Sequence, residues 1–328
     1  MSNIANLPYG NFLFLTALNS LCACAVNCFF LITGWFCAKK NNVNIRKPVH
    51  ILFVFCAYKF LTYNLSVLLG FKAFDSVRFL GSFLPNSYFA LMYASVLMLS
   101  PFVNLLISKL RFSDFRKLIV LLCCLFSLYP SAADFLCARL GIGYMGMSNI
   151  SIHGNDWGYT FVNFMFLYLL GAFLRLAKEN NSIVIFHQKR MNLFIYLLAS
   201  ALIFLSTFVN PHATNYCNPF VILQSIGIFL FFSNLSFHND VINWMSQSVW
   251  GVYVIHMGIL WFWSFFSIQQ YVQKSILFVA GNVFVVTVSV FTFSVLLEKI
   301  YNLILFPVRK FANGIRLCNI NIEVDFNV

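Results

Sequence analysis

The chain has 328 residues, of which 61% are hydrophobic and only 9% are charged. A soluble domain is nearer ~45–50% apolar and ~25% charged, so this composition excludes a water-soluble enzyme and indicates an integral membrane protein. The formal net charge is +12. Nucleic-acid binding is one explanation for that charge, but basic residues also collect in the cytoplasmic loops of membrane proteins.

Apolar runs recur along the whole chain, and most have the length of about 20 residues that a helix needs to cross a hydrocarbon core of roughly 30 Å. The shorter, alternating strands of an outer-membrane barrel do not occur in the sequence. We therefore expect an all-α, polytopic helical bundle with about nine transmembrane helices. It forms one membrane domain over residues 1–310, followed by a short cytoplasmic tail over 311–328. The expected spans are 12–36, 48–70, 86–108, 117–137, 158–177, 191–209, 219–235, 248–267 and 276–306.

Basic residues are unevenly divided between the two sets of connections. One set contains 16 of the 21 Lys and Arg residues, including Arg46, Lys47 and Arg175. The positive-inside rule places that set, and the C-terminus, in the cytoplasm, and with nine spans the N-terminus is then expected on the outer side. This distribution explains the net charge without nucleic acid. Most of the ten Cys lie in apolar runs, where thiols behave as small hydrophobes, and no metal site is expected.

Two titratable side chains, Lys59 and His256, interrupt apolar runs. A charged group within a span is costly unless it is paired or faces water, so each is a functional candidate. His256 is either a general base, since an imidazole titrates near neutral pH, or a neutral side chain hydrogen-bonded to a neighbouring helix. Lys59 either has a structural role, in which its ammonium pairs with a carbonyl or a distant acid or snorkels past Tyr58 and Tyr63, or attracts an anionic group of a substrate.

A basic cluster between the first two spans includes Lys39, Lys40, Arg46 and Lys47. It is either a topological signal or a site for the phosphates of a nucleotide-containing cofactor. The hydrolase and phosphate-loop patterns GxSxG, HExxH and GxxxxGK are absent from the sequence. The residues alone therefore fit a transporter, a polymerase and a membrane acyltransferase equally well.

Four stretches carry further information through their order and spacing. Residues 25–40 read AVNCFFLITGWFCAKK and include a Thr-Gly-aromatic step before a basic pair. Residues 88–104 end in Ser-Pro-x-x-Asn, residues 161–175 contain Tyr-Leu-x-Gly-x-x-x-Arg, and residues 248–257 contain Gly-x-Tyr-x-x-His. Together they resemble the bacterial membrane-bound acyltransferase-3 family, whose members include O-acetyltransferases of lipopolysaccharide O-antigens and other surface glycans. Individually, Gly34 and Pro101 also fit ordinary helix packing, with Ser100 and Asn104 satisfying the backbone that Pro101 leaves free.

The resemblance implies a multi-pass enzyme of the bacterial inner membrane. It would transfer an acyl group, expected to be acetyl, from acyl-CoA to a hydroxyl of a surface polysaccharide or its lipid-linked precursor. No permanently bound cofactor is expected, acetyl-CoA being the donor, and the other partners are the glycan and the bilayer. On this basis we assign His256 and Tyr253 to catalysis, Arg46 and Lys47 to the donor's phosphates, and Lys59, Thr33 and Asn104 to the substrate path.

The chain also departs from the family pattern, because members usually have ten spans. The first family span carries an Arg and a His that is regarded as central to acyl transfer. This chain begins just before what resembles the second span, which agrees with the outward N-terminus inferred from charge. We expect either a start upstream of Met1 or a truncated product, and in a complete member His256 would support the missing histidine. The alternative function is a carrier or flippase for a lipid-linked sugar, with Lys59 and His256 lining its path.

Overall fold

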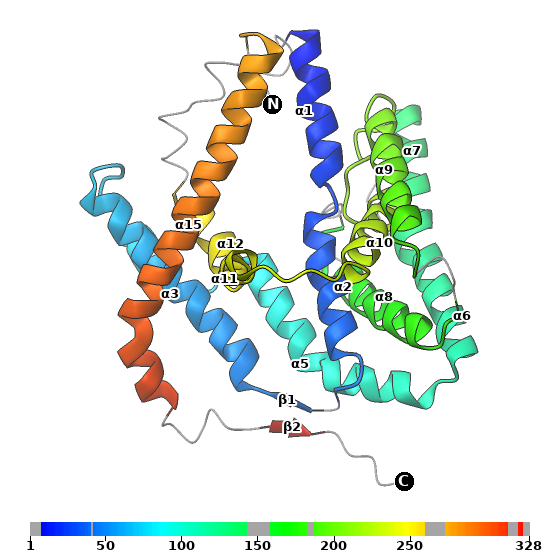
Figure 1. The fold of residues 1–328 in the computed structure, drawn as a ribbon, viewed down its shortest axis with the longest axis horizontal. Coiled ribbons are helices and arrows are strands. Elements are labelled where there is room, and N and C mark those ends of the chain that lie inside the picture. Colours follow the sequence, from blue (N-terminus) through cyan, green and yellow to red (C-terminus); the bar gives the residue numbers. More distant parts are fainter. Residues whose placement is uncertain are drawn as a thin grey trace. The chain divides into compact units, whose positions relative to one another are not determined.

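The computed structural model describes residues 8–40, 42–142, 158–182, 187–259, 273–313 and 321–323. These residues are almost entirely helical (Figure 1), apart from two three-residue strands that pair with each other. This confirms the predicted all-α class. The elements are α1 (Tyr9–Cys22), α2 (Ala25–Cys37), β1 (Asn42–Asn44), α3 (Arg46–Leu68), α4 (Ser76–Gly81), α5 (Tyr88–Lys109), α6 (Phe112–Cys123), the π-helix η1 (Cys124–Leu128), α7 (Tyr129–Leu140), α8 (Phe161–Glu179), α9 (Lys189–Ser206), α10 (Pro219–Ser233), α11 (Asp240–Ser246), α12 (Val249–His256), α15 (Ile276–Asn313) and β2 (Asn321–Glu323).

Seven helical segments of the described chain are long and apolar enough to cross a membrane, and each overlaps a predicted span. The shorter apolar helix α10 occupies an eighth. Large apolar side chains are exposed along these helices, as at Leu277 and Leu303, which are 83% and 76% accessible. Such surfaces suit contact with lipid rather than with water. The chain is therefore a multi-pass membrane protein, and the count of about nine spans stays a prediction. The segments are Tyr9–Cys37, Arg46–Leu68, Tyr88–Lys109, Phe112–Leu140, Phe161–Glu179, Lys189–Ser206 and Ile276–Pro307.

Two of the predicted spans are not single unbroken helices. Run 12–36 is divided into α1 and α2, and in run 248–267 helix α12 ends at His256, with a turn at 257–259. Residues 260–272 lie outside the described chain, so the remainder of the predicted span 248–267 stays a prediction. Gly258 lies in this turn, and glycine is needed there because a Cβ would lie only 2.5 Å from the Thr62 side chain on α3. Conversely, α15 is longer than predicted: its 38 residues measure about 57 Å at 1.5 Å per residue.

The chain forms two compact units, each assembled from segments distant in sequence. The first, here called the α3 unit, comprises Met1–Phe14, Asn44–Ala94 and Phe237–Ile322. Its core lies where α12 packs against both α3 and α15. Tyr58 of α3, Ile255 of α12 and Val286 of α15 are among the buried side chains of this core. The predicted single domain over 1–310 stays a prediction, as does the tail, most of which lies outside the described residues.

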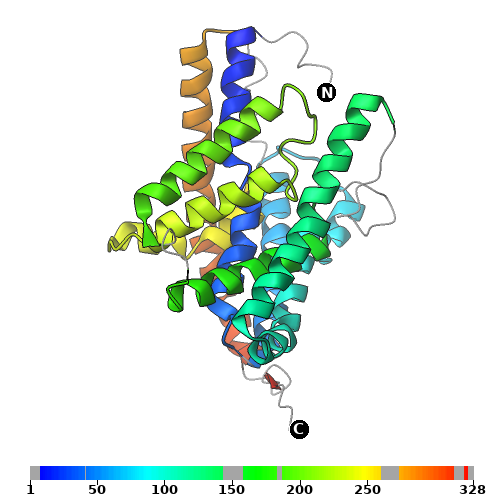
Figure 2. The same cartoon turned by 90° about the vertical axis from the view of Figure 1, so that its right-hand side faces the viewer.

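The second unit, here called the α8 unit, comprises Leu15–Val43, Ser95–Ser236 and Glu323–Val328. Helix α8 packs against α2 and α6, while α10 packs against α9 and α2. Figure 2 shows α9 and α10 running side by side. Eleven of the 19 residues of α8 are buried, which follows from a sequence that is apolar around most of the helix. This helix therefore forms the centre of its unit.

Candidate functional site

A cavity of about 600 Å³ lies within the α3 unit, a volume in the range of about 300–1,000 Å³ that is typical of ligand sites. It is larger than two cavities of the α8 unit, which measure about 390 and 340 Å³. Helix α3, the α3–α5 connection and the end of α12 all contribute to its wall. The lining residues are Phe55, Lys59, Thr62, Tyr63, Lys72, Val77, Arg78, Gly81, Ser82, Asn86, Ser87, Tyr253, Val254, Met257 and Gly258. Two predicted site residues, Lys59 and Tyr253, thus meet in one cavity.

Lys59 is half-buried, and its ammonium binds two neutral acceptors. It donates hydrogen bonds to Gly81 O at 2.6 Å and to Asn86 Oδ1 at 2.7 Å. Of the structural alternatives for Lys59, pairing with a carbonyl is the one that the structure shows, and its role in the substrate path stays a prediction. Neutral acceptors solvate the ammonium without cancelling its charge, so Lys59 remains a source of positive potential in the cavity wall.

The α3–α5 connection is folded back against α3 by backbone contacts of Asp75. The Tyr63 hydroxyl donates to Asp75 O at 2.9 Å and accepts from Asp75 N at 2.7 Å. The Asp75 carboxylate caps α4 by accepting from two backbone amides, and it pairs with Arg78 at 3.4 Å. Aromatic packing adds to these contacts, as between Phe60 and Phe79, whose ring centroids are 5.5 Å apart. This arrangement brings Arg78 to the cavity wall.

Tyr253 and His256 are one turn apart on α12, with ring centroids separated by 5.9 Å. Tyr253 lines the cavity and packs against Phe89, with the two rings tilted by 45°, whereas His256 is half-buried beside it and is not part of the wall. His256 Nδ1 lies 3.1 Å from Val252 O. A carbonyl only accepts hydrogen bonds, so Nδ1 carries the proton and Nε2 holds the lone pair in the neutral ring. The partner is thus a carbonyl of its own helix, rather than the neighbouring helix that the structural alternative proposed.

A buried acid next to α12, Glu298, is absent from the predicted site residues. It is 6% exposed and accepts a hydrogen bond from Ser248 Oγ at 2.8 Å. The Tyr58 hydroxyl lies 3.2 Å from its Oε1, Asn302 donates to the same oxygen, and Lys299 Nζ is 3.7 Å from Oε2. Glu298 therefore joins α3, α12 and α15. An acid within the apolar run 276–306 is the kind of signal that identified Lys59, and it would have revealed this residue.

Gly251, the first residue of the Gly-x-Tyr-x-x-His motif, allows this junction to form. A Cβ built on it would lie 2.1 Å from Glu298 Cγ and 3.1 Å from the Tyr58 ring. Any larger residue would push α12 away from α15. The glycine of the motif therefore has a packing role, and through it the positions of Tyr253 and His256 depend on Glu298.

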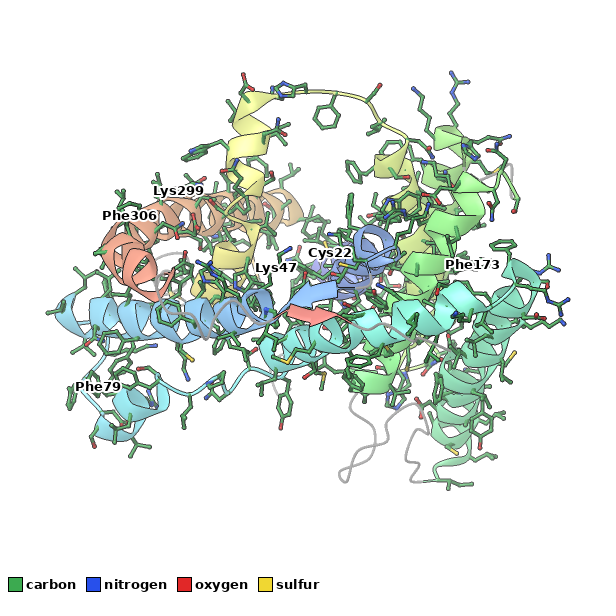
Figure 3. The ribbon with its side chains drawn as sticks, turned by 90° about the horizontal axis from the view of Figure 1, so that it is seen from below. Cys22, Lys47, Phe79, Phe173, Lys299 and Phe306 are labelled. Atoms are coloured by element: carbon green, nitrogen blue, oxygen red, sulfur yellow. The ribbon has the colours of Figure 1, made fainter. Side chains whose placement is uncertain are left out.

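Arg46 and Lys47 occupy the first turn of α3, and the residue before them provides no side-chain cap. The amino end of a helix attracts anions, and two cationic side chains there strengthen the attraction. Lys59 is 13 residues from Arg46 and nine from Leu68, which corresponds to about 20 and 14 Å along the helix. Figure 3 shows Lys47 at one end of α3 and Phe79, of the cavity-forming connection, near the other. The basic pair and the cavity thus lie toward opposite ends of α3.

In the α8 unit, the glycines of two family-like stretches allow α2 and α8 to touch. A Cβ on Gly34 would lie 1.9 Å from Tyr168 O, and one on Gly171 would lie 2.2 Å from Leu31 O. Backbones this close require glycine on both helices. The interpretation of Gly34 as a packing residue is confirmed.

The remaining polar residues of these stretches hold helices together. Asn104 Nδ2 donates to Cys37 O at 2.6 Å and to Lys40 O at 2.8 Å, and its Oδ1 accepts from Tyr168 Oη at 2.7 Å. Thr33 Oγ1 donates to Phe29 O of its own helix at 2.7 Å. Thr33 and Asn104 belong to the α8 unit and Lys59 to the α3 unit. The assignment of Thr33 and Asn104 to a substrate path stays a prediction, because these contacts explain both side chains without a substrate.

Two further sequence features have local structural roles. Ser100 Oγ donates to Leu97 O at 2.8 Å, the carbonyl that Pro101 leaves without its helical partner. The expectation is therefore confirmed for Ser100 and wrong for Asn104, whose amide donates to Cys37 O and Lys40 O instead. Arg175 Nη1 donates to Trp35 O at 2.9 Å, near the end of α2, and its Nε donates to Glu179. The arginine of the third stretch thus fastens α8 to α2.

Comparison with known proteins assigns these features to one family. The acyltransferase domain model of the acyltransferase-3 family matches residues 3–299, most of the chain. No curated protein and no solved structure gives a match. The match includes the helices that form the cavity, the Glu298 junction and the α2–α8 contact. The chain therefore belongs to the acyltransferase-3 family of membrane acyltransferases.

Proposed function

We propose that this protein transfers an acetyl group from acetyl-CoA to a hydroxyl of a cell-surface polysaccharide or of its lipid-linked precursor. Membership of an acyltransferase family favours this chemistry over the lipid-linked sugar carrier that the polar groups alone left open. The observation that supports the site most directly is the α3-unit cavity, whose wall contains Lys59 and Tyr253. His256 lies beside Tyr253 on the same helix.

In the proposed reaction, a sugar bound against Tyr253 extends its hydroxyl past the cavity wall to the neighbouring His256. His256 Nε2 accepts the proton of this hydroxyl while the alkoxide oxygen attacks the thioester carbonyl. A carbon–oxygen bond forms, the carbon–sulfur bond breaks, and the departing CoA thiolate takes the proton from the imidazolium. The Nδ1 hydrogen bond to Val252 O supports this role, because it leaves Nε2 as the ring's acceptor. The Tyr253 hydroxyl would polarise the carbonyl as negative charge develops on its oxygen. If a longer form of the protein contributes the family's leading histidine, that residue would be the base and His256 would support it.

The donor would bind at the Arg46 end of α3. Its phosphates would meet Arg46, Lys47 and the helix amino end. The count of basic residues supports a cytoplasmic position for this end and for the C-terminus. The acceptor would then enter the cavity near the Leu68 end of α3, from the opposite face of the bacterial inner membrane. The acyl group, still bound to CoA as a thioester, would reach from the Arg46 end toward the cavity along the α3–α12 interface.

A transfer assay tests this proposal. Membranes containing the full chain are incubated with acetyl-labelled acetyl-CoA and glycan, and the label in the glycan is measured. We expect His256→Gln to lower transfer by roughly 100-fold or more at equal protein level, since a positioned base contributes about 10²–10⁴ in rate. His238→Gln is the matched control, because His238 is a surface residue of the same unit with 77% of its side chain exposed. Wild-type transfer by His256→Gln would overturn the assignment of the base.

A further inference from the structure

The cavity of the α3 unit has a strongly one-sided charge. Lys59, Lys72 and Arg78 all belong to its wall, and no Asp or Glu does in the described part of the chain. Asp75 is the nearby acid that pairs with Arg78, at 3.4 Å, and its carboxylate is also occupied in capping α4. The cavity therefore has excess positive charge at its wall.

Lys59 has the most restricted position of the three cations. It projects from within a membrane-spanning helix, and both of its acceptors are neutral oxygens. Keeping an ammonium at such a site costs solvation free energy that neutral acceptors restore only in part. The two contacts hold Nζ at the wall between α3 and the α3–α5 connection. A bound anion would supply the negative charge that the neutral acceptors of Lys59 do not.

The remaining wall is apolar and aromatic. Phe55, Val77 and Met257 line it with Tyr63 and Tyr253. Aromatic rings with hydroxyl groups suit sugars, because they offer both a flat apolar face and a hydrogen-bonding edge. A ligand that combines an anionic group with a sugar or an apolar portion would match this surface.

We propose that the cavity binds an anionic acceptor, in which a phosphate or carboxylate group contacts Lys59, Lys72 and Arg78 while the acylated sugar lies against Tyr253. This inference rests on the proposed function and adds the chemical class of the acceptor. Lys59 contacts the anion deepest in the cavity. Lys72 and Arg78, on the exposed connection, attract it to the entrance. The anion is either the pyrophosphate of a prenyl-linked glycan or the carboxylate of an acidic sugar.

Binding is measured without an acyl donor, on the purified full chain in nanodiscs of zwitterionic phosphatidylcholine. The probes are farnesyl pyrophosphate with farnesol as its neutral counterpart, and a glucuronate disaccharide with the matching glucose disaccharide. We expect at least one anionic probe to bind tenfold or more tightly than its neutral counterpart. The probe that does so identifies the source of the anion. Equal binding within both pairs would overturn the proposal.

Variants locate the binding in the cavity. Lys59→Gln is expected to weaken binding of the anionic probe about tenfold, while Lys59→Arg keeps the charge and most of the affinity. Lys72→Gln with Arg78→Gln is a second test on exposed side chains that the fold tolerates, and it should weaken binding to a similar degree. Lys274→Gln, an exposed cation of the same unit outside the cavity, is the matched control. Unchanged binding by both the Lys59→Gln and the double variant would overturn the proposal.

The result is separable from the test of the proposed function. The binding measurement uses no acyl-CoA, so a protein without transferase activity still gives an interpretable outcome. Full transfer to a neutral glycan by the Lys59→Gln variant would refute the anionic acceptor and leave the acyltransferase proposal intact. Loss of transfer in His256→Gln, with normal probe binding, would support both.

Discussion

The contact between α2 and α8 makes a sharp prediction about Gly34. In Gly34→Ala the new methyl group would lie 1.9 Å from Tyr168 O, whereas an ordinary contact begins at 3.4 Å. The two backbones must separate by about 1.5 Å at that point, the difference between those distances. Overpacking typically costs about 1–3 kcal/mol, or more where the neighbour is backbone and cannot rotate away. Since alanine regains up to about 1 kcal/mol through helix propensity, we expect a net loss of about 2 kcal/mol.

Unfolding by sodium dodecyl sulfate in mixed micelles, followed by circular dichroism, measures this loss. A change of about 2 kcal/mol raises the unfolded-to-folded ratio roughly 30-fold. Gly281→Ala is the control, because it makes the same substitution within α15, where nothing lies within 4 Å of the new Cβ. That variant should be as stable as the wild type or slightly more stable. If Gly34→Ala unfolds like Gly281→Ala, the close approach of α2 and α8 is wrong.

Two further predictions concern charged residues. Replacing both Arg46 and Lys47 with Gln should raise KM for acetyl-CoA about tenfold with little change in kcat, and the rise should be larger at low ionic strength. The control replaces Lys189 and Arg190 with Gln and should leave KM unaltered. If KM is unchanged in both double variants, the donor does not bind at the amino end of α3. Glu298→Ala should destabilise the fold by about 3 kcal/mol, because it leaves buried donors without their acceptor. The control is Glu179→Ala. The Glu179 side chain is 38% exposed and pairs with Lys39 and Arg175, so its loss should lower the free energy of unfolding by less than about 1 kcal/mol. Similar losses at Glu298 and Glu179 would contradict the central position of Glu298.

The positions of the helices were largely predictable, because apolar content alone identifies a segment that has to lie in a bilayer. Helix α8 is the clearest case, since its sequence is apolar around most of the helix and most of it is buried. The break between α1 and α2 and the end of α12 at His256 were not predictable. The sequence stays apolar on both sides of each, and the need for glycine at 258 comes from the Thr62 side chain of another helix.

Two residues of the cavity wall, Lys59 and Tyr253, were predictable individually, whereas their assembly with Lys72 and Arg78 was not. Lys59 is visible in the sequence as a charge in an apolar run, and Tyr253 through its motif. They meet because α12 packs against α3, and the α3–α5 connection completes the wall, since Tyr63 and Lys59 fasten it to α3 through backbone groups of Asp75 and Gly81. Every residue has a backbone carbonyl, so residue types and their spacing do not show which carbonyl accepts a hydrogen bond. Glu298 was detectable by type, whereas its partners on α3 and α12 required the fold.

The most direct test of the account is the chemical composition of the glycan that the protein modifies. Cells producing the full chain, His256→Gln or His238→Gln are compared by mass spectrometry of their surface polysaccharide before and after mild alkali. We predict alkali-labile acetyl esters in cells with the wild-type and His238→Gln proteins, and their loss with His256→Gln at an equal amount of polysaccharide. Polysaccharide that reaches the surface only when the protein is present, and without any ester, would contradict it and indicate a carrier.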